Sequence, residues 1–289
     1  MRLTFSIVLP TYKESNLGIL VKKLLAQDIP KGFNLQRIII VGLGFDKSDL
    51  NKIKKIHVIE EKFRNGKAIA ITKALKNIKS DVIILQSSDT QPADNTLKNI
   101  LLHFRDEKVG MVTGRPIPSD NPKYFSGFLN HLVWFLHHLI SLQKPKATEI
   151  TAFRVTFKKL PKKLVADEAY MESLIYRKGL NSVYSPKAIV YNKGPKSIKD
   201  FIAQRRRIFI GHLQIKDKFN YSVSTLSITR TIIALLEFSR KKLNRNYKEI
   251  LWLILAILLE SYARLLGAID YFIFNKIPYK WSIIKSAKL

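Results

Sequence analysis

An acidic residue with polar neighbours follows one of the apolar runs in the first half of the sequence. Asp89 comes shortly after Val82–Gln86, preceded by two serines and followed by the amide side chain of Gln91. Carboxylate and amide oxygens hold Mg²⁺ or Mn²⁺ in proteins, and diphosphate or water completes the coordination shell. The same residues would also form an ordinary turn closed by the aspartate side chain, so this segment alone fits both interpretations.

Two further segments could hold the parts of a nucleotide. Gly66 permits close approach of the backbone to a ligand, and Lys67 opens a helix whose N-terminus favours phosphate. Tyr12 and Glu14 bring an aromatic ring and a carboxylate to the end of the first apolar run, where a base and a ribose could be held. Each segment taken alone also fits a simple turn or a capped helix start.

An acidic pair and a basic run lie further along the chain. Asp167 and Glu168 stand at the start of a helical segment, where a carboxylate can remove a proton from an acceptor hydroxyl. The same two residues would also cap the helix and complement its dipole. Gln204, Arg205 and Arg207 form a basic run suited to phosphate groups, although such runs are commonly solvated surface.

The alternation of apolar segments indicates how these residues are positioned. Short β-branched runs alternate with segments whose apolar residues recur every three or four positions, which predicts βαβ units and a largely parallel sheet. Ligands then lie at the carboxyl ends of the strands. The predicted strands are Phe5–Leu9, Arg37–Val41, His57–Ile59, Val82–Gln86, Gly110–Thr113 and Ser182–Tyr184, and the predicted helices are Leu17–Gln27, Gly66–Ile78 and Glu168–Arg177.

The bulk composition narrows the classes of function. The chain has 289 residues, 46% of them hydrophobic, which is typical of a folded globular protein. Fifty Lys and Arg residues against 22 Asp and Glu give a net charge of +28, which attracts nucleic acid, anionic lipid or phosphorylated substrates. A nucleic-acid-binding protein is one alternative, but the basic residues are dispersed without a recognisable motif, and no nucleic acid partner is expected. The absence of cysteine excludes disulfides and cysteine-bound zinc.

The motifs, taken in their order and spacing, resemble the family 2 glycosyltransferases, which are enzymes of the GT-A fold. The resemblance covers about Phe5 to His212. It implies an α/β, Rossmann-like GT-A fold for nucleotide-diphospho-sugars, here with a C-terminal pair of apolar or amphipathic helices. The segments that carry it are Pro10–Glu14 (PTYKE), Asn65–Ala68 (NGKA), Ser87–Gln91 (SSDTQ), Ala166–Glu168 (ADE), Gly179–Tyr184 (GLNSVY) and Gln204–Ile208 (QRRRI).

The resemblance implies an inverting glycosyltransferase that moves a sugar from a nucleotide-diphosphate donor to a lipid-linked hydroxyl or phosphate. Its implied cofactor is Mn²⁺ or Mg²⁺, with Asp89 and Gln91 as ligands. Glu168 is the implied general base, and Asp167 stands one position before it. The implied diphosphate or acceptor contacts are Gln204, Arg205 and Arg207, and the implied nucleotide-sugar contacts are Pro10, Tyr12, Glu14, Gly42, Lys67, Ser88 and Asp89.

Three positions depart from the pattern of the family. Gly42 stands where the family usually has an aspartate that contacts the base, and Ser87 replaces the first aspartate of the metal motif. Ile208 replaces a tryptophan in the basic segment. These departures leave a second interpretation open, namely a catalytically impaired relative that binds nucleotide sugar or lipid.

The last part of the chain has a different character. After Tyr221, two apolar segments, Leu226–Phe238 and Ile250–Phe274, flank a basic stretch. Charged residues interrupt both segments, so neither contains the uninterrupted apolar run of about 20 residues that crosses a bilayer. We expect helices that lie in the membrane interface, anchored by Trp252 and Trp281. A soluble helical subdomain is the alternative.

We therefore expect a GT-A catalytic domain over residues 1–220 and a helical membrane-associating tail over residues 221–289. The protein would act at the cytoplasmic face of the cell membrane, bound to an anionic surface as a peripheral or monotopic protein. Within the tail, Glu260 and Arg264 are four residues apart, so they can pair on one face of a helix.

Overall fold

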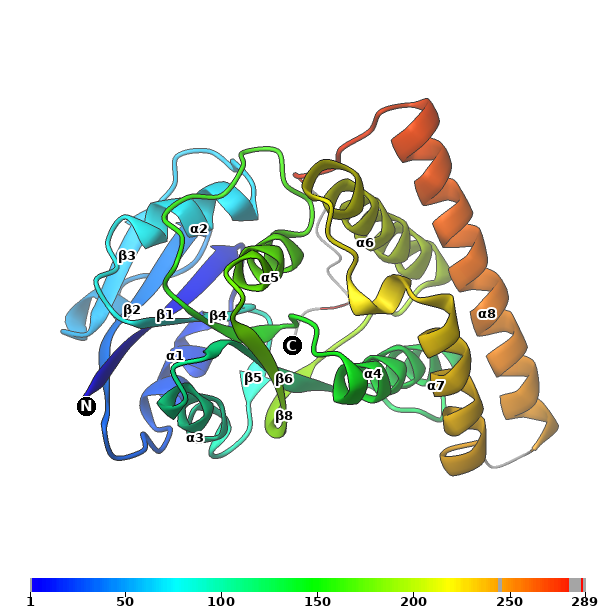
Figure 1. Ribbon diagram of the computed structural model, residues 1–289, viewed down its shortest axis with the longest axis horizontal. Helices are drawn as coiled ribbons and strands as arrows, with labels where there is room; N and C mark the ends of the chain where they lie inside the picture. The colour runs from blue at the N-terminus through cyan, green and yellow to red at the C-terminus, as the bar shows by residue number, and fades with distance from the viewer. Residues whose placement is uncertain (1, 244–245, 281–286, 288–289) are drawn as a thin grey trace.

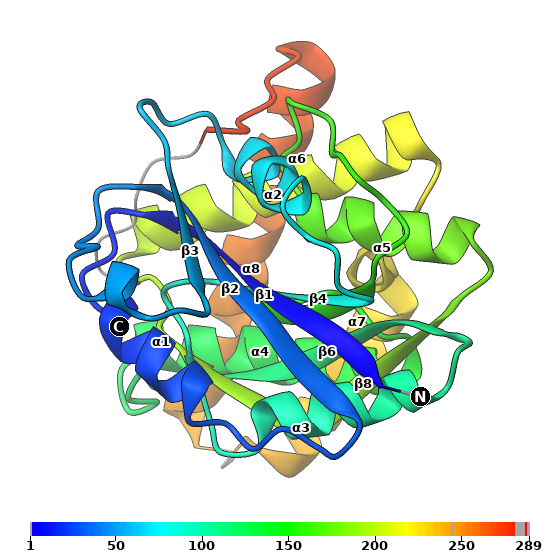
Figure 2. The ribbon, with the colours of Figure 1, turned by 90° about the vertical axis from the view of Figure 1, so that its left-hand side faces the viewer.

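A single eight-stranded sheet forms the centre of the protein, in the order β3-β2-β1-β4-β7-β6-β8-β5 (Figure 1 and Figure 2). The structure is a computed structural model that describes residues 2–243, 246–280 and 287. Helices cover both faces of the sheet, and the two C-terminal helices lie at the side opposite strand β3 (Figure 1). The predicted anchor Trp281 lies outside the described residues.

The first four strands are parallel neighbours, as predicted, and β1 pairs with both β2 and β4. Side chains of β1 alternate between the faces of the sheet, so that Ile7 packs in the cluster containing α1 and Val8 in the cluster containing α2. The elements of this half are β1 (Leu3–Tyr12), α1 (Leu17–Leu25), β2 (Phe33–Leu43), β3 (Ile56–Glu60), α2 (Lys67–Leu75) and β4 (Val82–Gln86).

A reversed strand lies in the middle of the sheet. β7 (Ile150–Arg154) runs antiparallel to both β4 and β6 (Val109–Pro118). Its first residue, Ile150, pairs with Gln86 at the end of β4, so the residue before β7 lies at the carboxyl edge of the parallel strands. The sheet ends with β8 (Asn181–Asn192) and the short β5 (Gln91–Pro92).

The remaining helices build the outer wall of the molecule. α3, α4 and α6 lie outside the predicted elements, whereas α5, α7 and α8 agree with predicted helices to within a few residues. The six helices of this wall are α3 (Thr96–Leu101), α4 (Phe125–Gln143), α5 (Asp167–Arg177), α6 (Ile198–Phe219), α7 (Ile228–Lys241) and α8 (Tyr247–Ala268). Helix α8 continues into a π-helical turn (Ile269–Ile273).

Helix α8 packs along α6 and leaves much of its own surface exposed. Gly267 of α8 approaches α6 so closely that an added Cβ would lie 3.1 Å from the Arg206 carbonyl oxygen. Arg206 also forms an ion pair with Asp270, which in turn pairs with Lys276 at 3.0 Å. The predicted boundary between residues 220 and 221 falls just after α6, and the division into two domains stays a prediction.

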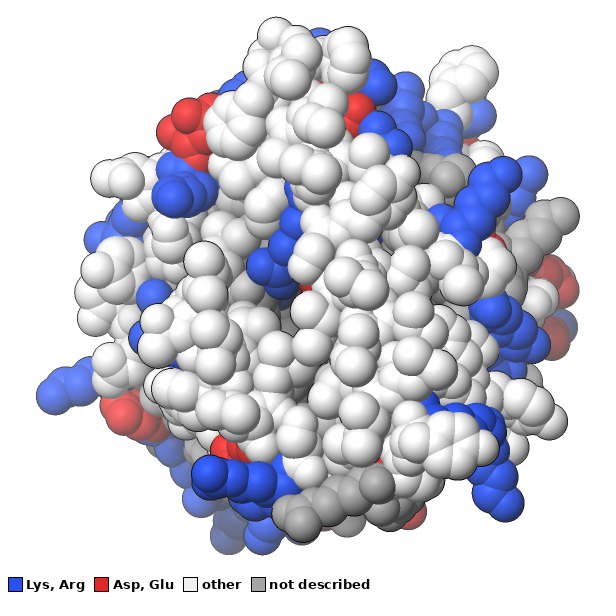
Figure 3. Space-filling view, turned by 90° about the vertical axis from the view of Figure 1, so that its right-hand side faces the viewer, with Lys and Arg blue, Asp and Glu red and all other residues white. Residues whose placement is uncertain are grey.

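The outer sides of α7 and α8 form a broad apolar surface, seen in Figure 3 as a largely uncharged face with Lys and Arg mainly around its edge and a few basic atoms near its centre. Among the described residues, the continuous helix Tyr247–Ile273 is the one that is long and apolar enough to cross a membrane, by length and composition alone. Exposed members of this apolar surface are Ile228, Ile232, Ile233, Leu236, Ile250, Leu251, Ile254, Leu255, Ile257, Leu258, Tyr262 and Leu265.

Candidate active site

A cavity of about 460 Å³ opens at the carboxyl ends of the parallel strands. Asp89 reaches it from the end of β4, Glu149 from the start of β7, and Asp167 and Glu168 from the start of α5. Lys67, the first residue of α2, faces the same space. A cluster of titratable groups in a cavity at this edge of an α/β sheet marks the candidate active site.

Lys67 bridges the two acidic residues that open α5. Its ammonium group donates to the Glu168 carboxylate and lies 3.4 Å from Asp167. Burial raises the pKa of Asp167 to about 7, and the negative charge of Glu168 adds to this effect. Burial also opposes ionisation of Glu168, but the charge and hydrogen bond of Lys67 outweigh it and lower the pKa of Glu168. Asp167 is therefore poised to exchange a proton near neutral pH, whereas Glu168 stays ionised.

Glu149 lies beside Ser87, which is far from it in the sequence. The Ser87 N–H donates to the Glu149 carbonyl at 2.8 Å, and the Ser87 hydroxyl donates to the Glu149 carboxylate. Burial raises the pKa of the neighbouring Asp89 to about 6, and the negative charge of Glu149 contributes to the rise. The charge of Glu149 thus opposes the ionisation of Asp89, and a bound cation would relieve that repulsion.

Basic side chains line the other walls of the cavity. Burial lowers the pKa of Lys146, and it lowers the pKa of Arg207 to about 10. Arg205 turns toward α8 and donates two hydrogen bonds to Glu260, at 2.7 and 3.0 Å. Glu260 also accepts from Arg264 at 2.8 Å, so the predicted pairing of Glu260 with Arg264 is confirmed. Arg205 thus joins α6 to α8 while still lining the cavity.

The segment Pro10–Glu14 lies at the carboxyl end of β1, beside the end of β2. The parallel register sets Thr11 beside Gly42 and Tyr12 beside Leu43. Gly42 has a φ of +152°, and an added Cβ would lie 1.7 Å from the Thr11 carbonyl oxygen. No residue with a side chain fits this backbone, which explains the absence of an aspartate at position 42. The Arg64 guanidinium lies over the Tyr12 ring, 4.1 Å from its centroid.

About half of the site residues predicted from the sequence line this cavity. Gln91, expected to bind metal, pairs with Tyr191 in the short strand β5 and does not line the cavity. Sequence reasoning missed Glu149 and Lys146, which do line it. The predicted residues in the lining are Lys67, Asp89, Asp167, Glu168, Gln204, Arg205 and Arg207, and those outside it are Pro10, Tyr12, Glu14, Gly42, Ser88 and Gln91.

The opposite end of the cavity is apolar and lies among α4, α7 and α8. Ile228 and Ile232 line this end and are also 74% and 51% exposed. The cavity therefore connects the acidic cluster with the exposed apolar surface of the C-terminal helices. Its apolar lining includes Leu129, Val133, Leu136, Ile140, Ile228, Ile232, Leu235 and Ile257.

Comparison with known families decides the class of the protein. The profile described as Glycosyl transferase family 2 matches residues 6–165, more than half of the chain. The chain belongs to this family. The prediction of a glycosyltransferase is thereby confirmed. No curated protein gives a significant match to the sequence of this family 2 glycosyltransferase.

The likeness to one solved structure agrees with the family at the level of the fold. A mannosyltransferase from Pyrobaculum calidifontis, PcManGT in complex with GDP-Man and Mn²⁺, aligns with a TM-score of 0.63 and 17% identity over 96% of this glycosyltransferase and 89% of that chain. The structure of S. aureus TarS 1-349 aligns with a TM-score of 0.47 and 17% identity, over 99% and 95% of the two chains. The likeness to PcManGT supports the predicted GT-A fold, which is confirmed.

Proposed function

We propose that this glycosyltransferase moves a sugar from a nucleotide-diphosphate donor to a lipid-linked acceptor at the cytoplasmic face of a membrane. The observation that carries the proposal is the cavity that joins the acidic cluster to exposed apolar side chains of α7. Its polar end suits a diphosphate and a sugar, and its apolar end suits a hydrocarbon chain. The two substrates would meet near Asp89 and Asp167.

The donor would bind along the carboxyl edge of the sheet. Tyr12 offers a ring for the base, and Glu14 is a buried carboxylate on the same segment. Lys67 stands at the N-terminus of α2, a position that favours phosphate, and would exchange its carboxylate partners for the diphosphate. GDP-mannose is the first donor to test, because PcManGT is in complex with GDP-Man.

The residues of the site fit Mn²⁺ or Mg²⁺ bound through Asp89 and Glu149. Their mutual repulsion favours a cation, and both offer the oxygen ligands that these metals prefer. Among the described residues, no group of three or more histidine or carboxylate side chains is arranged to hold a metal, so diphosphate oxygens would complete the shell. Such a metal would stabilise the negative charge of the leaving group. Glu149 would supply the carboxylate that Ser87 lacks, which argues against a catalytically impaired relative.

The acidic pair on α5 would supply the general base. The family resemblance assigns Glu168, but an ionised carboxylate held by Lys67 is a weak proton acceptor. Asp167 has the pKa that suits proton transfer near neutrality. The acceptor oxygen would attack the anomeric carbon while its proton passes to Asp167. The nucleoside diphosphate would leave with the electron pair of the broken carbon–oxygen bond, which inverts the configuration.

The acceptor would arrive from the membrane. The exposed leucine and isoleucine side chains of α7 and α8 would lie in the interface, with the surrounding Lys and Arg at the level of anionic head groups (Figure 3). The apolar end of the cavity would then face the lipid, so a chain-bearing acceptor could enter without crossing water. A lipid-linked hydroxyl fits best, because it needs the base that Asp167 provides.

A donor panel followed by a product assay tests the proposed function. We expect one nucleotide sugar to raise the thermal midpoint of the full-length protein selectively in the presence of Mn²⁺. With that donor labelled and membrane lipids supplied, we expect the label to enter a product that organic solvent extracts. Label transferred only to water-soluble acceptors would contradict the lipid-linked acceptor, and no midpoint shift with any donor would contradict donor binding.

A further inference from the structure

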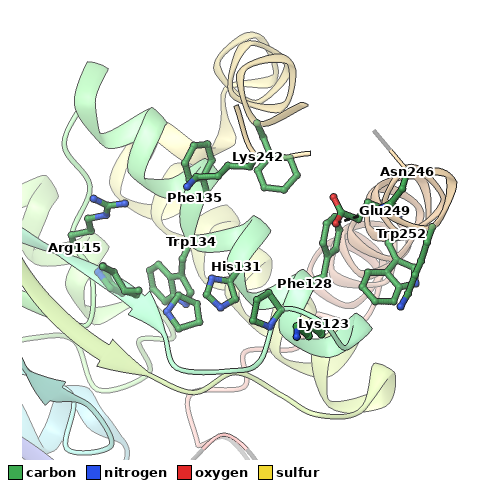
Figure 4. Close-up of a pocket in the computed structure, with 16 residues that line it drawn as sticks. Arg115, Lys123, Phe128, His131, Trp134, Phe135, Lys242, Asn246, Glu249 and Trp252 are labelled. Carbon is green, nitrogen blue, oxygen red and sulfur yellow. Dashed lines mark hydrogen bonds between the residues drawn. The ribbon is translucent and has the colours of Figure 1, made fainter. Parts of the chain in front are cut away.

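Figure 4 shows a second cavity, of about 670 Å³. Its lining contains none of the residues proposed for catalysis. It is bounded by the end of β6, by α4, by the end of α7 and by the start of α8. Within the described part of the chain, Trp134 is the one residue that lines both this cavity and the catalytic one. An occupant of the second cavity would therefore not touch Asp89, Asp167 or Lys67.

Aromatic rings from three helices form one wall of this second cavity. The ring centroid of Trp252 in α8 lies 5.5 Å from that of Phe128 in α4, and Phe128 lies 5.9 Å from Phe238 in α7. Phe135 of α4 continues the row, 5.6 Å from Phe238. Rings packed across three helices give a firm apolar surface against which the carbon atoms of a ligand can lie.

Four cationic side chains line the same cavity, against one carboxylate, Glu249. The Lys248 ammonium lies 4.6 Å from the centroid of Trp252, and that of Lys242 lies 5.7 Å from the centroid of Phe135. None of the four forms an ion pair with another described residue, so their positive charge is available to an anion. The four are Arg115, Lys123, Lys242 and Lys248.

The two helices that carry the exposed apolar surface, α7 and α8, also supply lining residues of the second cavity. Leu236, 57% exposed, lies within one turn of the lining residue Phe238. Leu251, 52% exposed, precedes the lining residue Trp252. A ligand with an anionic head and hydrocarbon chains can contact the cations and these leucines together. A free nucleotide or a polysaccharide has no chains to cover the leucines.

We propose that the second cavity binds the anionic head group of a membrane phospholipid, whose acyl chains lie on the outer surface of α7 and α8. The phosphate accepts hydrogen bonds from Lys242 and Lys248, and the glycerol carbons lie against the aromatic wall. This inference rests on the membrane placement in the proposed function. It adds a lipid site that is separate from the acceptor route.

The test is a titration of the full-length protein with dihexanoyl phosphatidylglycerol below its micelle concentration, followed by calorimetry. Monomeric lipid presents no charged surface, so only a discrete site gives saturable binding. The double variant K242Q/K248Q removes two lining charges, and we expect it to weaken binding by about tenfold or more. The control R240Q/K241Q removes two charges from the same basic segment outside the cavity, and we expect a change below about twofold. Equal losses in the two variants would overturn the proposal.

Two further ligands show which parts of the lipid the second cavity recognises. Dihexanoyl phosphatidylcholine has the same chains without net charge, and inorganic phosphate has the charge without chains. We expect both to bind at least about tenfold more weakly than the anionic lipid, because each loses one of the two contributions. Phosphate binding as tight as lipid binding would make this a free-anion site and refute the lipid. Equal affinity for phosphatidylcholine would refute the role of the cations.

Donor binding separates this proposal from the proposed function. We expect K242Q/K248Q to keep the thermal shift produced by donor and Mn²⁺, because neither residue lines the catalytic cavity. If the wild-type protein binds no donor, the proposed function fails, while the lipid titration still decides the second site. If the variant loses both lipid and donor binding, its effect is not local and the assignment of the second cavity is contradicted.

Discussion

The Ser87 hydroxyl hydrogen-bonds to the Glu149 carboxylate at the carboxyl end of β4. This contact places an acidic side chain beside position 87, where the metal motif of the family usually has its first aspartate. Glu149 reaches this edge of the sheet from the amino end of β7, because β7 runs antiparallel to β4. The departure at position 87 is therefore matched by the carboxylate of Glu149, the residue immediately before β7.

Metal binding should depend on Glu149. We expect Glu149→Gln to weaken Mn²⁺ binding in the presence of nucleoside diphosphate by about tenfold or more, because an anionic ligand is replaced by a neutral one. Electron paramagnetic resonance of bound Mn²⁺ measures this directly. The exposed Glu107→Gln serves as the control for loss of one negative charge. Adding Ser87→Asp to Glu149→Gln should restore binding, and a double variant as weak as the single one would speak against the replacement.

The pH profile of sugar transfer should fall on its acidic side because Asp167 becomes protonated. The pKa of Asp167 is raised to about 7 by burial and by Glu168, so the carboxylate needed as base disappears as pH falls below 7. We expect kcat/KM to decline on that side, and Asp167→Asn to lower it by about a hundredfold or more while leaving donor binding intact. Glu168→Gln should retain more activity. The reverse order of the two variants would return the role of base to Glu168.

The free energy of unfolding of the ligand-free protein should also depend on pH through Asp167. A folded-state pKa raised above the ordinary value of 3.8 means that the native state holds its proton more tightly than the unfolded chain. Stability from this group is thus complete at low pH and is lost as pH rises toward and through 7. We expect Asp167→Asn to gain stability over wild type by on the order of 1 kcal/mol at pH 8, and less at pH 5. Chemical denaturation at the two pH values measures the difference, and a larger gain at pH 5 would contradict the raised pKa.

Position 42 should accept glycine alone. An added Cβ lies 1.7 Å from the Thr11 carbonyl oxygen, and φ is +152°. We therefore expect Gly42→Ala to cost about 2 kcal/mol or more of the free energy of unfolding. Gly18→Ala is the matched control, because nothing lies within 4 Å of an added Cβ there. It should be neutral or stabilising, and urea unfolding that ranks the two variants alike would show that β1 and β2 separate to admit a side chain.

Membrane binding should depend on the outward apolar side chains of α7 and α8. Leu236 and Leu258 are 57% and 60% exposed, and neither lines a described cavity. We expect L236E/L258E to weaken binding to anionic vesicles by about tenfold or more, because each leucine loses its burial in the interface. The control I19E/L142E introduces the same charges on the exposed surface of other helices. A control that reduces vesicle binding as strongly would point to net charge as the sole cause.

The predictable parts of the protein are those with a local signal. β1 to β4 and α2 follow from periodicity and turn residues within each segment, so the positions of Lys67 and Asp89 relative to the sheet edge were foreseeable. Glu149 was not, because its place depends on which strand β7 joins and in which direction. The motif spacing predicts Gln91 as a ligand, whereas its backbone pairs with β8 and the residue does not line the cavity. The order of the motifs therefore predicted where the candidate site lies, and long-range strand pairing decided which side chains line its cavity.

The ionic contact of Glu260 with Arg205 and Arg264 lies in the contact between α6 and α8. Sliding or turning α8 would separate Glu260 from Arg205 and leave the largely buried guanidinium of Arg205 without its carboxylate partner, whereas Arg264 would stay beside Glu260 on the same helix. The helix is accordingly fixed in one rotational setting against the catalytic half. Whatever surface α8 rests on, the pitch and height of the reaction centre above it depend on this ion pair together with the close packing of Gly267 and the pair between Arg206 and Asp270.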